Sequence, residues 1–75
     1  MIYAKCLKDR NPWGGHKYPL EIGKMYKVNR IDMSQSYTNV YLIGIKEPIN
    51  SVCLSFFEDD KPINIYNDKR FNPYL

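Results

Sequence analysis

The residues that could carry out catalysis are few, and they are scattered along the chain. His16 is the only histidine, and neither cysteine, Cys6 or Cys53, has a partner in CxxC or CxxH spacing. A nucleophilic thiol needs a base beside it, and a zinc site needs several closely spaced thiolates or imidazoles. We therefore expect no enzyme, no cofactor and no metal site, and we expect both thiols to be free and buried within strands.

Two further patterns that could indicate a catalytic or phosphate-binding site are equally weak. Glu58, Asp59 and Asp60 are adjacent in sequence, which predicts a solvated acidic turn and not a spaced acid–base pair. Gly14 and Gly15 lack the further glycine and the lysine that a phosphate-binding loop requires. The sequence thus favours a binding protein over a catalyst.

Basic and aromatic residues gather in the first part of the chain. Residues 1–30 hold seven basic and two acidic side chains, whereas residues 31–75 hold four basic and six acidic ones. Aromatic rings that could stack on bases are interleaved with the basic residues. The rings are Tyr3, Trp13 and Tyr18, and the basic residues are Lys5, Arg10, Lys17, Lys24, Lys27 and Arg30. Because the net charge of the whole chain is only +3, this pattern predicts weak, non-specific nucleic-acid binding as an alternative function.

The elements that must position these residues are strands. No stretch carries the i, i+3, i+4 apolar stripe of a helix, whereas alternation of apolar residues recurs along the chain. We predict strands near residues 2–7, 25–33, 37–45 and 51–57, with a short fifth strand at 63–65 and a turn at 46–50. That turn leaves no room for the helix that an OB-fold places between its third and fourth strands.

The second of these strands carries a change of phase. Tyr26 and Val28 fall on one face, but Ile31 and Met33 would point to the opposite face of an undisturbed strand. A β-bulge near residues 29–30 would return them to the inner face, as happens where a strand passes from one sheet to another in small barrels.

Residues 9–19 form the longest stretch without periodicity. Two prolines and two adjacent glycines exclude a helix or a regular strand there. Loops of this length in compact domains are functional or folded back on themselves, so Trp13 or Tyr18 either anchors the loop or contacts a partner. We expect the binding surface to comprise Trp13, His16, Lys17 and Tyr18 in this loop, with Lys24 and Lys27 beside them.

The final segment, residues 63–75, is too apolar for a disordered end. We predict an ordered tail that packs on the barrel and covers the outer face of the 37–45 strand. The alternative is a contact with a second subunit, so we favour a monomer, with a dimer through the tail as the other arrangement.

The run from Ile22 to Val28, with its Gly-Lys-x-Tyr-x-Val turn, resembles the small SH3-like barrel proteins of bacteriophages, prophages and mobile elements. Residues 50–57, a strand that closes in Phe-Phe, continue the likeness. The resemblance implies one domain over residues 1–75, all-β, a small SH3-like antiparallel barrel of about five strands with an ordered tail. It implies little chemistry, because such proteins are mostly uncharacterised.

The most economical functional hypothesis is a small binding or adaptor module for an unidentified protein partner, acting in the cytoplasm. No apolar run approaches the roughly 18 residues of a membrane span, so we expect no membrane contact. The long loop lacks the acidic residues of eukaryotic SH3 domains, which bind proline-rich peptides, so that specificity is not expected.

Overall fold

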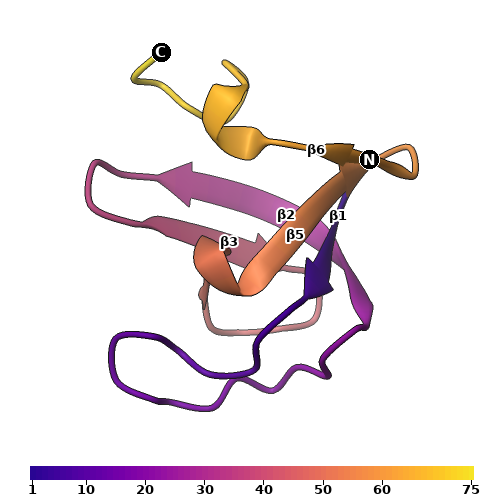
Figure 1. The fold of residues 1–75 in the computed structure, drawn as a ribbon, viewed down its shortest axis with the longest axis vertical. Helices are drawn as coiled ribbons and strands as arrows, with labels where there is room; N and C mark the ends of the chain where they lie inside the picture. Colours follow the sequence, from indigo (N-terminus) through magenta and orange to yellow (C-terminus); the bar gives the residue numbers. More distant parts are fainter.

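The computed structural model describes all of residues 1–75, and the chain is all-β (Figure 1). The strands are β1 (Ile2–Cys6), β2 (Met25–Met33), β3 (Thr38–Leu42), β4 (Ile49–Asn50), β5 (Leu54–Glu58) and β6 (Lys61–Ile63). Two short 3₁₀ turns, η1 (Ser51–Cys53) and η2 (Ile65–Asn67), are the only helical segments. None of the helical segments is long and apolar enough to cross a membrane.

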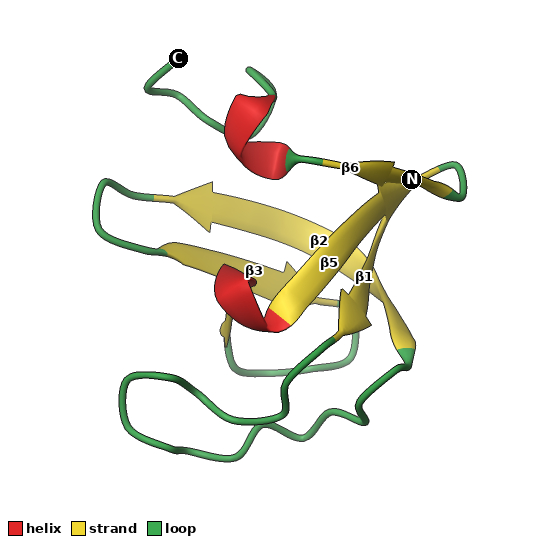
Figure 2. Ribbon diagram, viewed as in Figure 1, coloured by secondary structure: helices red, strands yellow, loops and turns green.

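All six strands join one antiparallel sheet in the order β4-β3-β2-β1-β5-β6. The chain meanders from β1 to β4 and then returns through η1, so that β5 pairs along the whole of β1. β1 and β5 run across β2 and β3 (Figure 2). The sheet is open, with β4 and β6 at its two edges.

The predicted bulge in the second strand is confirmed. Pairing between β2 and β3 shifts register between Val28 and Arg30. As a result Tyr26, Val28, Ile31 and Met33 all pack against the hydrophobic core. The bulge therefore lets one continuous strand serve two halves of the sheet with the same face turned inward.

The prediction for residues 46–57 is partly wrong. Ile49 and Asn50 form β4 instead of a turn, and the next three residues form η1 before β5 begins. The Asn50 side chain causes the change, because its Oδ1 accepts the N–H of Val52 at 3.1 Å and caps the 3₁₀ turn. Val52 is consequently exposed, while Cys53 is fully buried.

The last strand also begins earlier than predicted, at residues 61–63 instead of 63–65. Asp59 and Asp60, with φ of 51° and 65°, form the tight turn of a β5–β6 hairpin. Aspartate tolerates this left-handed conformation better than most residues, and it matches the twist of a two-residue hairpin. Pro62 is accommodated because β6 is an edge strand.

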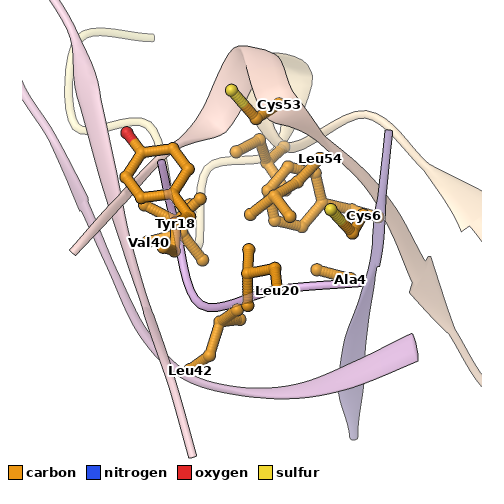
Figure 3. Close-up of a cluster of buried hydrophobic side chains, with 11 residues drawn as sticks. Ala4, Cys6, Tyr18, Leu20, Val40, Leu42, Cys53 and Leu54 are labelled. Atoms are coloured by element: carbon orange, nitrogen blue, oxygen red, sulfur yellow. The ribbon is translucent and has the colours of Figure 1, made fainter. Parts of the chain in front are cut away.

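The core unites strands with the segment that joins β1 to β2, residues 7–24, which we call the first loop. Figure 3 shows Tyr18 and Leu20 of this loop among side chains of β1, β3 and β5. The core comprises Ala4, Cys6, Tyr18, Leu20, Val40, Leu42, Ile49, Cys53, Leu54, Phe56 and Ile65. Both thiols are free and buried as expected, and burial raises the pKa of each.

Candidate functional site

The first loop places Trp13 at its tip. A short turn holds the tip, in which the Asn11 side chain accepts the N–H of Trp13 at 2.8 Å and the Asn11 backbone donates to His16. Gly15, with a φ of 69°, supplies the left-handed conformation that the turn requires. The Trp13 residue is 79% exposed, so it is not the anchor of the loop.

Tyr18 is the anchor, and its assignment to the contact surface is wrong. The residue is only 2% exposed, and its hydroxyl accepts the N–H of Asn50 at 3.2 Å. Burial raises the pKa of this phenol. Its ring ties the loop to β4 and is not available to a partner.

The three cations near the tip of the first loop have acidic or carbonyl partners. His16 Nε2 lies 2.8 Å from Glu47 Oε2, and Lys17 Nζ lies 3.9 Å from an Asp9 carboxylate oxygen. Arg10 donates to the Gly15 carbonyl at 3.1 Å. The tip therefore presents an isolated indole, and the cations beside it are compensated.

Lys24, the last residue of the first loop, and Lys27 of β2 are separate from the tip residues. Lys24 Nζ lies 5.5 Å from the centroid of the Tyr26 ring, at the start of β2. Lys27 is exposed on the outer face of the sheet, directly opposite Tyr3 of β1. The six residues predicted as one binding surface thus divide into an exposed loop tip, a buried anchor and a separate part of the sheet.

The most marked hollow of the molecule lies elsewhere, between the β2–β3 turn and the C-terminal tail, residues 64–75. Its volume is about 450 Å³, and we call it the tyrosine cleft. Its lining is Met33, Ser34, Gln35, Ser36, Tyr37, Thr38, Asn50, Ser51, Val52, Tyr66, Asn72 and Tyr74. No sequence pattern indicates this cleft, because its two walls are about thirty residues apart in the chain.

Hydrogen bonds fix both walls of the tyrosine cleft. On one side, Ser34 N–H and Oγ both donate to the Tyr37 carbonyl, at 2.9 and 2.6 Å. On the other, the Asn72 side chain donates to the Tyr66 carbonyl at 2.7 Å and accepts the N–H of Tyr74 at 2.9 Å. The Tyr66 hydroxyl meets Ser51 Oγ of η1, which joins the tail to the floor of the cleft.

An ion-pair cluster, which we call the Arg70 clamp, fastens the same tail to β5. The guanidinium makes two bonds of 2.8 Å to the Glu58 carboxylate and further bonds to Asp68. These side-chain hydrogen bonds from Arg70 lower the pKa of both carboxyl groups. Nearby, Ile65 is buried and Phe71 is half-buried against the core.

The chemistry of the tyrosine cleft is neutral. None of its lining side chains is acidic or basic, whereas Tyr37 and Tyr74 are each more than half exposed. A second hollow of about 380 Å³, lined mainly by apolar residues, shares Ser51, Val52 and Tyr66 with it. The two hollows are therefore adjacent, and we call them together the groove; their lining suits an uncharged chain with hydrogen-bonding and apolar groups.

Comparison with known proteins gives one match. The family model described as Bacteriophage T4 protein Y07B matches residues 1–75, the full length of the chain. No curated protein and no solved structure matches it.

Proposed function

We propose that this chain, which belongs to the Bacteriophage T4 protein Y07B family, is a small protein-binding module. The membership confirms the resemblance to phage proteins. In this proposal the groove formed by the tyrosine cleft and its neighbouring hollow holds an extended, uncharged segment of a partner protein. The observation that carries the proposal is this pair of adjacent hollows, which share Ser51, Val52 and Tyr66 and are lined without a single charge.

The side chains of the groove suit protein recognition. Tyrosine supplies a large, rigid contact area with a polar end, and it is enriched at the centres of protein interfaces. Tyr37 and Tyr74 stand on opposite walls and are half exposed without a partner. Neither His, Cys, Lys, Asp nor Glu lines either hollow, so no such side chain stands beside the serine hydroxyls of the groove to activate them as nucleophiles.

We further propose that the sheet is an SH3-like barrel. Its support is the topology: four meandering strands, a long connection between β1 and β2, and a 3₁₀ turn before a fifth strand that returns beside β1. The bulge in β2 provides the bend that such a barrel needs. The tail and β6 are additions to that plan, and they build one wall of the groove.

The family and the state of the thiols support a proposal for the partner and the place of action. For a phage protein the partner would be a host protein or another protein of the phage. Free, buried thiols at Cys6 and Cys53 support action in a reducing compartment such as the cytoplasm. We propose a monomer, because the tail is held by contacts within its own chain.

Selection from a library of random short peptides, followed by amide chemical-shift mapping on the protein, tests the proposed function. We expect selected peptides to be uncharged and to shift the amides of Tyr37, Val52 and Tyr74. Substituting both exposed tyrosines (Tyr37→Ala with Tyr74→Ala) should weaken binding by about tenfold or more, the loss of about one interface hot spot.

The matched control is Trp13→Ala, which removes a more exposed ring from the first loop, a segment at the other end of the molecule from the C-terminal tail (Figure 1). It should leave peptide binding unchanged. Shifts that gather around Trp13, or a selection that yields only charged peptides, would contradict the proposal.

A further inference from the structure

The outer face of the sheet around β1 carries an ordered set of side chains that the groove does not use. Inward positions of β1 and β5 are filled by core residues, so Tyr3 and Phe57 both point outward. The register places them directly opposite one another on adjacent strands. Tyr3 is 38% exposed and Phe57 is partly exposed, so both rings are accessible from solvent.

Lysines flank this aromatic pair. Lys27 of β2 lies opposite Tyr3 on its other side, and Pro62 of β6 lies opposite Phe57, giving one row across four strands. In the next row of the same face, Lys5 of β1 lies opposite Met25 of β2. Both lysines are exposed, and neither takes part in an ion pair.

No carboxylate stands at an outward position of β1, β5 or β6, and the one on β2 is Asp32, which lies beyond the bulge. The acidic residues nearest in sequence follow Phe57 at the end of the hairpin, where Glu58 is held by Arg70 and Asp59 lies 4.0 Å from the N-terminal amine. The cations at the tip of the first loop, in contrast, have acidic or carbonyl partners. Lys5 and Lys27 thus give this face unpaired positive charge beside exposed rings, which suits an anion.

We propose that this face binds single-stranded nucleic acid, with Tyr3 and Phe57 as stacking platforms and Lys5 and Lys27 as phosphate contacts. Directly opposed residues have Cβ atoms about 5 Å apart, so adjacent rings can take successive bases of one strand. The site is separate from the peptide groove and does not depend on it.

Two features select a single strand over a duplex. Stacking on a protein ring needs a base whose face is free, and in a duplex these faces are already stacked. The sheet face also lacks a projecting helix or ribbon that could enter the major groove. Two phosphate contacts predict weak binding, with little sequence preference.

Fluorescence anisotropy with labelled DNA and RNA of mixed sequence, about ten nucleotides long, tests the inference. We expect both single strands to bind at least about tenfold more tightly than the matching duplex at equal salt. With two phosphate contacts, affinity should fall with a logarithmic salt slope of about −1.4. That slope corresponds to about sevenfold weaker binding between 50 and 200 mM salt.

Substitutions distinguish the contribution of the aromatic rings to binding from that of the lysines. Tyr3→Leu and Phe57→Leu should each weaken binding by about tenfold, because each removes one stacking surface while keeping apolar bulk. Thermal unfolding of each variant shows whether it is folded. If Tyr3→Leu is unfolded, Phe57→Leu tests the stacking surface instead. Trp13→Ala should bind as the unmodified chain does.

To test the lysines, the double substitution of Lys5→Gln with Lys27→Gln should abolish most of the salt dependence of nucleic-acid binding. The control pair, Lys46→Gln with Lys69→Gln, removes the same charge elsewhere and should change the affinity by less than about twofold. Equal losses in the two pairs, equal binding of the duplex, or loss through Trp13→Ala alone would overturn the inference. So would an acidic peptide that binds as tightly with the same variant dependence, which would assign the face to an acidic protein.

Discussion

The first loop and the C-terminal tail both lie outside the sheet, at opposite ends of the long axis of the molecule, and different forces hold them (Figure 1). The loop is fixed by two fully buried side chains, Tyr18 and Leu20. The tail is fixed by one, Ile65, together with the exposed Arg70 clamp. Burial resists salt and acid, whereas exposed ion pairs do not, so the two segments should respond differently to the same perturbation.

The largest effect is expected from Tyr18→Ala. Removing a buried ring leaves a cavity and should lower the free energy of unfolding by about 3–5 kcal/mol. A chain of this length has about 4–11 kcal/mol in total, so the variant should be close to unfolded at room temperature. Urea denaturation followed by circular dichroism measures this. Tyr18→Phe, which removes only the hydroxyl, should cost about 1 kcal/mol, and an equal cost for the two variants would show that packing does not anchor the loop.

Ile65→Ala comes next, because Ile65 is the tail's one fully buried residue. It should lower the free energy of unfolding by about 2–4 kcal/mol and loosen the tail more than the loop. Urea denaturation measures the total loss in the free energy of unfolding, and amide exchange shows which parts of the chain are loosened. Uniformly faster exchange would indicate that the tail and the sheet unfold as one unit, which would remove the contrast between the two segments.

Arg70→Gln should act on the tail alone. The clamp is exposed to solvent, so the melting temperature should change little. The amides of Asn72 and Tyr74 should exchange faster, because this part of the tail loses its attachment to β5. Lys69→Gln is the matched control, since it removes a neighbouring charge that makes no ion pair. A large drop in melting temperature for Arg70→Gln would show that the clamp contributes to the whole fold.

Acid should release the clamp in the same way. The pKa values of Glu58 and Asp68 are lowered from their ordinary values of 4.5 and 3.8 by hydrogen bonds from Arg70. Their stabilising contribution is therefore complete above those ordinary values and is lost as the pH falls below them. Amide spectra recorded from pH 7 to pH 3 should show the tail changing before the first loop does. In Arg70→Gln the tail should already be loose at pH 7.

Trp13→Ala should have the smallest effect. The residue is 79% exposed, and surface substitutions of this kind usually change the free energy of unfolding by less than about 0.5 kcal/mol. Chemical denaturation measures the change. A loss approaching that of Tyr18→Ala would mean that the indole packs in solution, and the comparison of anchor and exposed tip would fail.

The sequence predicted the strands well where alternation was regular. The bulge in β2 followed from the phase change between Val28 and Ile31, since only one face of a strand can meet the core. The prediction failed at residues 49–53, where a hydrogen bond from the Val52 N–H to the Asn50 side chain outweighs alternation. Side chains such as asparagine can compete with a strand for backbone groups, and periodicity does not encode the outcome.

The candidate sites were predicted less well, for a different reason. Trp13 and Tyr18 are both aromatic residues of one loop, and only the three-dimensional fold decides which of them reaches the core. The tyrosine cleft brings together Tyr37 and Tyr74, which are distant in sequence. The Arg70 clamp joins the tail to β5 through Arg70 and Glu58, which are 12 residues apart. Contacts of this kind carry no periodic signal along the chain.

The two buried thiols can be used to measure how often this small protein opens locally. Cys6 Sγ donates to the Lys8 carbonyl and Cys53 Sγ to the Arg10 carbonyl, both at 3.3 Å, so each sulfur reports on the first residues of the loop. A thiol reagent can reach either one only after a local opening, because the thiols are buried and their pKa values are raised. The rate of labelling, compared with that of a free thiol, therefore measures how often this junction opens in the native protein. Mass spectrometry can follow both sites at once and record whether they open together or one after the other.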